Sequence, residues 1–214
     1  YFVALFEALR YTSSVSTSAL FTLTPFFTAA FAWVILGQRV SRGLLLWLLV
    51  ASIGAIWVVF DANWRDLIRF QLGRGEKIFL AGVIAHALYI PLARRLDRGE
   101  PILTFTFGVL AGGSIPLFVV SMPELLDIQW HTLPEIVWVT LAYIIVFPTL
   151  ISFALLQYAN QRLPGAQVMA YTYLVPGWVV VWDAALGRGI PELMTLLGIG
   201  LTLFAMLMLL RNKE

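Results

Sequence analysis

The chain has 214 residues, of which 60% are hydrophobic and 12% are charged, and its formal net charge is +2. Soluble domains are nearer one half apolar and one quarter charged, so this composition excludes an ordinary soluble domain and indicates a protein whose main solvent is lipid. The small net charge argues against nucleic acid as a partner, and the absence of cysteine excludes disulfides and thiolate metal sites.

Long apolar runs follow one another along the whole chain. A helix needs about 20 mostly apolar residues to cross a bilayer, and continuous runs of this length favour helices over the alternating strands of a barrel. We therefore expect an all-α polytopic membrane protein, a bundle of about seven complete transmembrane helices plus a partial one. The partial span is expected at 1–12 and the complete spans at 14–36, 43–61, 77–96, 101–122, 135–158, 165–186 and 192–211.

Turn-forming residues separate the expected spans. They are Gly37, Gly99–Pro101, Met122–Pro123, Pro164–Gly165 and Gly189–Pro191. The start of the chain has no such border. It begins with apolar sequence at Tyr1, and no charged region precedes it, which is not the pattern of a signal peptide. We expect a chain that enters partway through a helix.

The segment 62–76 is more polar than the spans around it. Trp64, Leu67, Ile68 and Leu72 recur at helical spacing with charged residues between them. This pattern is typical of a short helix that lies in the membrane interface. An ordinary charged loop explains the same residues.

Two parts of the sequence resemble each other. FEALRYT (6–12) resembles FALLQYA (153–159), and TLTPFFTAAFAWVILGQRV (22–40) resembles TYLVPGWVVVWDAALGRGI (172–190), with a shared proline and a shared Leu-Gly pair. The second copy begins five expected spans after the first, and an odd number of crossings turns the second copy upside down in the membrane. The pattern predicts an inverted-topology repeat, a construction found in secondary transporters.

Three stretches resemble the EamA-type family of the drug/metabolite transporter superfamily. ALRYTSSVSTSALFTLTPFFTAAFAWVILGQRVS (8–41) is similar to its fourth-helix region, and GEKIFLAGVIAHALYIPLARRL (75–96) to its sixth helix. LQYANQRLPGAQVMAYTYLVPGWVVVWDAALG (156–187) is similar to the second-repeat counterpart. The resemblance implies ten helices in two inverted five-helix repeats, in a bacterial cytoplasmic (inner) membrane. By that count the chain lacks the first two helices and part of the third.

The resemblance also implies a domain organisation. Residues 1–61 correspond to the end of helix 3 and to helices 4 and 5 of the first repeat, 62–76 to an interfacial connector, and 77–214 to helices 6–10 of the second repeat. The sequence departs from the family where Gln38 and Arg188 replace the usual glutamate after Leu-Gly.

Basic residues set the expected orientation. With a cytoplasmic C-terminus, as the family also has, eight of the 14 Lys and Arg residues lie inside and six lie outside. This small bias agrees with the positive-inside rule.

Asp183 interrupts an apolar run, and an acid at bilayer depth costs about 2.5–3.5 kcal/mol on insertion scales. Pro176 and Thr172 share its helix face, and Pro176 has no N–H to offer the carbonyl of Thr172. We interpret this face as a site for a polar or cationic substrate group or for a coupled proton. A structural aspartate that is hydrogen-bonded to a neighbour, or solvated near the outer interface, is the alternative.

Pro25 and Pro176 occupy matching positions of the two copies, and prolines in such positions point to the binding site of a transporter. Thr22 shares the face of Pro25, and Tyr171 and Trp178 share a face in the second copy, so all three are candidates for lining a substrate pocket. Prolines that only kink a helix, and aromatic residues that only anchor it at the interface, explain the same residues.

Two further residues are candidates for proton coupling. His86 lies within an apolar run and is able to titrate near neutral pH, or it is a neutral packing residue. Glu7 lies three residues before Arg10, which equally suits an ion pair. We expect no metal site, because His86 and His131 are not spaced to share a metal ion.

Small residues indicate where helices pack closely. These are Gly108, Gly112 and Gly113 in one expected span, and Gly198 with Thr202 in another.

The pattern as a whole favours a secondary-active transporter of small organic metabolites or drugs. It would be an exporter working by alternating access, driven by a proton or solute gradient, with the lipid bilayer and a small-molecule substrate as partners and no cofactor. The alternatives are a seven-helix receptor and an intramembrane enzyme. The sequence disfavours both, because Lys77 and Lys213 lie at membrane edges and no paired membrane acids or nucleotide-binding loop occur.

Overall fold

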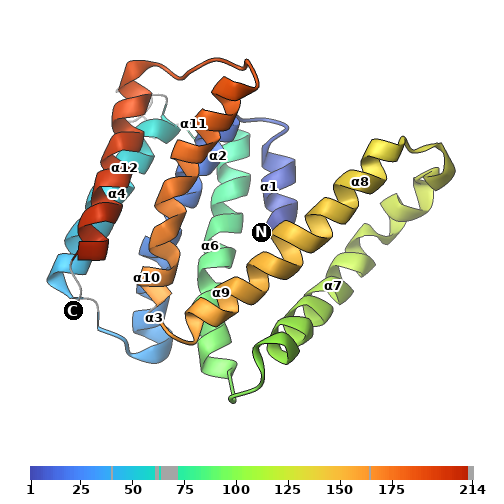
Figure 1. The fold of residues 1–214 in the computed structure, drawn as a ribbon, viewed down its shortest axis with the longest axis horizontal. Coiled ribbons are helices and arrows are strands. Elements are labelled where there is room, and N and C mark those ends of the chain that lie inside the picture. The colour runs from blue at the N-terminus through green and yellow to red at the C-terminus, as the bar shows by residue number, and fades with distance from the viewer. Residues whose placement is uncertain (40, 61–62, 64–71, 164, 212–214) are drawn as a thin grey trace. The chain divides into compact units, whose positions relative to one another are not determined.

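The computed structural model describes residues 1–39, 41–60, 63, 72–163 and 165–211, and every regular element in these ranges is helical (Figure 1). Five described stretches are long and apolar enough to cross a membrane. They are Ser14–Leu36, Arg42–Val59, Arg74–Leu96, Ile102–Asp127 and Glu135–Asn160. The expected all-α polytopic membrane fold is confirmed.

The two other expected complete spans are also helical. Residues 165–185 form α10 (Gly165–Ala170), the 3-10 helix η3 (Tyr171–Leu174) and α11 (Val175–Ala185) in succession. The last span is α12 (Leu193–Arg211). Most of the expected connector 62–76 lies outside the described residues, and α6 (Arg74–Leu96) begins inside its end.

The chain packs as two compact units, residues 1–95 with 163–214 and residues 96–162. The first unit contains helices from both expected repeats, so this division follows packing and leaves the repeat boundaries a prediction. Besides α6, α10, η3, α11 and α12, the first unit contains α1 (Phe2–Ala8), α2 (Ser14–Phe21), α3 (Thr24–Leu36) and α4 (Arg42–Val59).

Two helices of the first unit are interrupted at related places. Thr22 and Leu23 separate α2 from α3, and η3 separates α10 from α11. Pro25 and Pro176 are each the second residue of the helix that follows the interruption. Proline suits this position because its missing N–H has no partner in a first helical turn.

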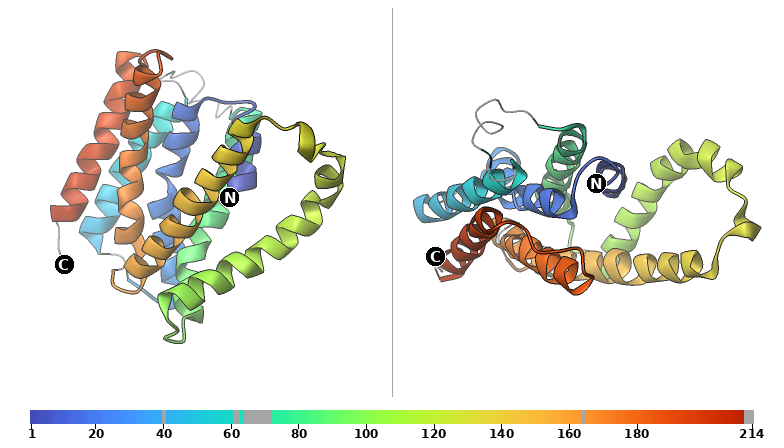
Figure 2. Two further views of the ribbon diagram at one scale, coloured as in Figure 1. Left: turned by 45° about the vertical axis from the view of Figure 1, so that its right-hand side comes forward. Right: turned by 90° about the horizontal axis from the view of Figure 1, so that it is seen from above.

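The interrupted helices and the helices that follow them pack in related pairs. α2 packs on α11, and α10 packs on α3. α2 also packs on α4 as α10 does on α12, while α4 and α12 pack on each other and lie side by side (Figures 1 and 2). Exchanging the two copies therefore turns every one of these packing pairs into another of the set, as a two-fold relation between the copies requires.

Glycine lets α4 and α12 approach closely. A Cβ atom at Gly54 would lie 2.7 Å from the carbonyl oxygen of Gly198 and 3.1 Å from Cγ2 of Thr202. The indole N–H of Trp57 donates to the carbonyl of Met194 at 3.0 Å beside this crossing. The expected role of Gly198 and Thr202 in close helix packing is confirmed.

The second unit is a helical hairpin. It comprises α7 (Ile102–Asp127), the 3-10 helix η1 (Trp130–Thr132), α8 (Glu135–Ile144), the π-helix η2 (Ile145–Ile151) and α9 (Ser152–Asn160), and α9 packs on α7. The expected break at Met122–Pro123 is wrong, because α7 continues through Pro123 to Asp127. Proline ends a helix less often in membranes, where other groups satisfy the freed carbonyl.

The expected close packing at Gly108, Gly112 and Gly113 of α7 is also wrong. A Cβ atom at any of them would meet no atom within 4 Å in the chain as the structure describes it. Most side chains of α7 and of Glu135–Asn160 face outward, and these side chains are largely apolar. Lipid is the medium that suits such a surface.

The crossing of α4 and α12 generates a stability prediction. We expect Gly54→Ala to lower the stability of the folded protein by about 1–3 kcal/mol, because the new methyl group meets backbone that cannot rotate away. Gly200→Ala on α12 is the matched control, because a Cβ atom there meets nothing within 4 Å among the described residues. Thermal unfolding of the purified protein in detergent measures both, and equal melting temperatures for the two variants would contradict the packing argument.

Candidate functional site

Asp183 joins α11 to α2. Its Oδ2 accepts a hydrogen bond from the hydroxyl of Ser14 at 2.7 Å, and its Oδ1 pairs with Nη1 of Arg188 at 3.2 Å. The Asp183 side chain is 13% exposed and that of Arg188 is 66% exposed. The carboxylate thus lies at the end of α11, with a neutral donor on one oxygen and a solvated cation on the other.

Glu76 makes a similar connection between α6 and α2. Its Oε1 accepts hydrogen bonds from the hydroxyls of Thr12 and of Ser16, the second at 3.1 Å. Glu76 is half-buried in the first turn of α6. Sequence reasoning missed this residue because it stands in the charged run RGEK, which is typical of an ordinary membrane-edge segment.

Hydroxyl groups of one short stretch, residues 12–16, therefore bind both carboxylates. Ser13 caps α2 by accepting the N–H of Ser16 at 3.0 Å, and the neighbouring hydroxyls point to two other helices. We call the set the hydroxyl–carboxylate cluster. It consists of Thr12, Ser13, Ser14, Ser16, Glu76 and Asp183.

The structure does not bring Thr172 into contact with Asp183. The two are 11 residues apart on one interrupted helix, or about 16 Å along its axis. The Thr172 hydroxyl donates to the carbonyl of Met169 at 2.7 Å. Its own carbonyl accepts the N–H of Val175, so the acceptor expected to be left free by Pro176 is used within η3.

The backbone carbonyl groups at the interruption between α2 and α3 find donors in a related way. The carbonyl of Phe21, which Pro25 leaves without its helical donor, accepts the hydroxyl of Thr24 at 2.6 Å. Thr22 is buried and donates its hydroxyl to the carbonyl of Ala19 at 2.6 Å. Local hydroxyl and 3-10 bonds thus replace the helical bonds that proline removes.

Tyr171 and Trp178 lie on the surface of the first unit. Their side chains are 53% and 59% exposed, whereas Pro25 and Pro176 are buried. The structure thus brings the prolines into the helix packing and leaves both aromatic side chains outward.

His86 and Glu7 each have neighbours that explain their positions. The His86 ring is half-buried, with ring centroids of Tyr1 and Phe21 at 4.6 and 5.5 Å. Glu7 pairs with Arg10 at 3.1 Å, as the spacing in the sequence suggests. Their expected part in proton coupling stays a prediction.

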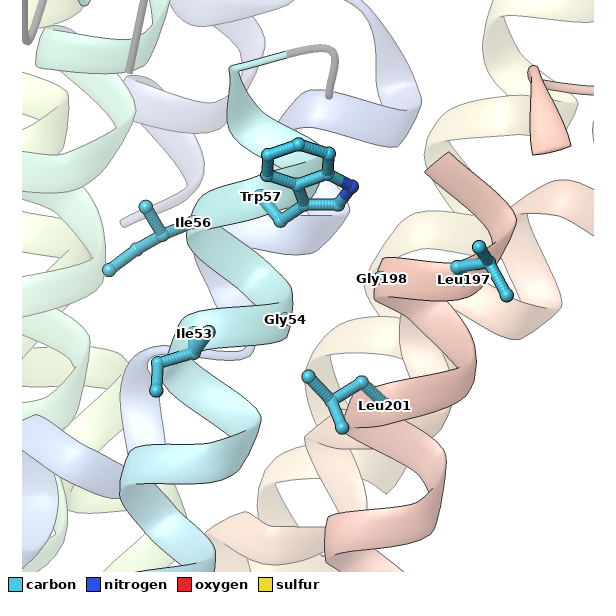
Figure 3. A pocket seen from close by; sticks show the side chains of 7 residues that line it. All are labelled: Ile53, Gly54, Ile56, Trp57, Leu197, Gly198 and Leu201. Carbon is cyan, nitrogen blue, oxygen red and sulfur yellow. The ribbon is translucent and has the colours of Figure 1, made fainter. Parts of the chain in front are cut away.

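An apolar cavity of the first unit is a groove between α4 and α12 with a volume of about 570 Å³ (Figure 3). None of the predicted site residues lines it. Its lining is apolar apart from the indole nitrogen of Trp57, which donates to Met194. The lining residues are Ile53, Gly54, Ile56, Trp57, Leu197, Gly198 and Leu201. Such a groove suits an acyl chain or an apolar side chain better than a polar solute.

Metal binding has no support in the described residues, among which no three His, Cys, Asp or Glu side chains gather closely enough to hold an ion.

Comparison with known proteins identifies the family of this chain. The sequence model of the EamA-like transporter family matches residues 1–60 and 73–211. The uncharacterized transporter YyaM of Bacillus subtilis (strain 168) is 25% identical over 186 residues, which are 86% of this chain and 61% of that protein. The chain thus spans less than two thirds of the length of this relative. No solved structure matches the chain.

The bond between Ser14 and Asp183 is testable by a double-mutant cycle. We expect Ser14→Ala and Asp183→Ala, each of which removes one partner of the bond, to be coupled by about 1.5 kcal/mol, because a hydroxyl bonded to a carboxylate contributes more than a neutral pair. Ser114→Ala is the matched control, since its hydroxyl donates to Ala111 of its own helix. The free energies of unfolding of the single and double variants give the coupling. Additive effects for Ser14 and Asp183 would show that the bond is not made.

Proposed function

The chain belongs to the EamA-like transporter family, and from this membership we propose that it serves the secondary-active transport of small organic metabolites or drugs across a membrane. We propose further that the transport is export by alternating access. The observation that carries alternating access is the exchange symmetry of the first unit, in which α2 packs on α11 and α10 packs on α3, while export is what the family resemblance implies.

This packing supports a rocking motion. The two packing pairs lie at opposite ends of two interrupted helices, so opening one while closing the other would expose the space between the copies to each side of the membrane in turn. When the copies are aligned on their shared Leu-Gly pair, Asp183 corresponds to Trp33. The hydroxyl–carboxylate bond between α2 and α11 therefore has no equivalent between α10 and α3, and the two ends differ in what holds them closed.

We assign the hydroxyl–carboxylate cluster the role of a latch on the α2–α11 end. Protonation of Asp183, or a cationic group of the substrate, would compete with Arg188 for the carboxylate and loosen the bond to Ser14. Glu76 would hold α6 to the same turn of α2. Support comes from the placement of both carboxylates on hydroxyls of one turn, between three different helices.

The substrate would bind near the two interruptions. Thr22, Pro25, Thr172 and Pro176 surround these places, with Tyr171 and Trp178 beside them. Irregular backbone at membrane depth is tolerated where it is buried in protein or lines a cavity, which makes the interruptions the best candidates for the transport path.

The distribution of arginine supports a cytoplasmic C-terminus. Arg39 follows α3, Arg42 begins α4, Arg94 and Arg95 lie in the last turn of α6, and Arg211 ends α12. Glu76 lies at the opposite end of α6 from Arg94 and Arg95, and Asp183 lies beside it, since both acids bind hydroxyls at the start of α2. By the positive-inside rule the arginine-rich end faces the cytoplasm, which would put the latch at the outer side of a bacterial inner membrane.

The latch predicts that Asp183→Asn lowers transport at least ten-fold or removes its pH dependence, while the amount of folded protein is unchanged. The measurement uses the complete protein in liposomes loaded with a pH-sensitive dye, to which amino acids and cationic dyes are added one at a time. Glu192→Gln is the control, because this exposed acid lies before α12 and outside the cluster. Transport and a pH profile equal to those of the wild type would reject the role of Asp183.

A further inference from the structure

A second apolar groove opens between α3 and α4, and the proposed transport function does not use it. Its volume is about 480 Å³. One of its lining residues is charged and the others are apolar. The lining residues are Phe26, Ala29, Ala30, Trp33, Arg39, Leu45 and Leu48.

The residues at the floor of the groove are buried, and those at its rim are exposed. Ala29 and Leu48 are buried in its floor, whereas Trp33 is 62% exposed and Leu45 is 44% exposed at its rim. Both helices belong to stretches that are long and apolar enough to span the membrane. Within this unit the groove thus offers an apolar surface between two helices that are long enough to span a membrane.

Positive charge gathers at one end of the groove. α3 ends at Gly37, whose positive φ of 65° turns the chain, and Arg39 follows it. Arg42 is the first residue of α4, and both arginines are exposed. Nη1 of Arg95, at the end of α6, lies 3.5 Å from the carbonyl of Ile35 in the last turn of α3.

This charge is not neutralised by the described part of the protein. The segment 37–48, GQRVSRGLLLWL, contains no acid. The ion pairs among the described residues are Glu7 with Arg10 and Asp183 with Arg188, so neither Arg39 nor Arg42 pairs with a described carboxylate. The two guanidinium groups are therefore available to an anion at the surface of the membrane.

We propose that this groove is a binding site for one anionic glycerophospholipid of the surrounding bilayer. One acyl chain lies in the groove between α3 and α4, and the phosphate is bound by Arg39 and Arg42. The proposal goes beyond transport and holds whichever solute the protein carries.

The chemistry of the groove selects this occupant. An acyl chain has no polar groups, so the apolar lining costs it no hydrogen bonds. A guanidinium group matches a phosphate with two parallel hydrogen bonds. A helix of a second copy would have to leave the two guanidinium groups without an anion, unless it brought an acid to the same place.

Native mass spectrometry of the complete purified protein tests the site. Palmitoyl-oleoyl phosphatidylglycerol and the zwitterionic phosphatidylcholine of the same chains are titrated separately. We expect the wild type to retain one phosphatidylglycerol with an affinity at least five-fold above that for phosphatidylcholine, since one arginine near a lipid phosphate contributes about this factor.

Three variants test the charged end and the apolar part of the site. Arg39→Gln should lower the affinity for phosphatidylglycerol about five-fold and leave that for phosphatidylcholine unchanged. Ala30→Trp fills the groove and should weaken both lipids. Arg39→Lys retains the charge and should retain most of the preference.

Arg98→Gln is the matched control, because Arg98 is an exposed arginine of the other unit. Circular dichroism and retention volume establish that each variant is folded. Wild-type lipid preference in Arg39→Gln would overturn the proposal. A dimer that dissociates in Ala30→Trp, with no change in lipid preference, would overturn it in favour of a second copy of the chain.

Discussion

Carboxylates within a membrane bundle must find their donors inside the protein, because lipid has none to offer. The first unit meets this constraint with one turn of helix. Hydroxyls on either side of the N-cap of α2 reach Glu76 of α6 in one direction and Asp183 of α11 in the other. α2 also packs on α4 and on α11. The polar end of this helix thus fixes where three helices meet, and its register sets the packing that follows along their length.

The two prolines have a different part in the same structure. Each begins a helix after an interruption, and in each case a local bond replaces the one that proline cannot make. The interrupted helices remain closely packed because their halves exchange partners, α2 with α11 and α3 with α10. An uninterrupted pair of helices would make one continuous interface. Two half-interfaces, one of which opens as the other closes, are what the alternating access proposed above would use.

Small residues determine the contact between α4 and α12, and arginines determine the charge at the end of α3. Gly54 and Gly198 bring α4 and α12 into backbone contact, which gives the first unit a fixed seam between its two copies. Arg39 and Arg42, which follow α3, have no acid in the segment 37–48 around them, and they form the charged end of the lipid site proposed above. The acids of the cluster stay at the opposite end, where hydroxyls hold them.

Composition and periodicity were sufficient for the membrane class, for the helical spans and for the resemblance between the copies, because the cost of polar backbone in lipid leaves few other folds. The pair of prolines, the ion pair of Glu7 with Arg10 and the close approach at Gly198 were also visible in the sequence, since each depends on local spacing. Only the tertiary structure decided the partners of Asp183 and the importance of Glu76, whose hydroxyl donors are 169 and 60–64 residues away along the chain. It also showed that α7 continues through Pro123 and that its glycines meet no described neighbour. The reason is physical: spacing determines which residues share a helix face, whereas the residue that faces them across the bundle depends on how distant helices pack.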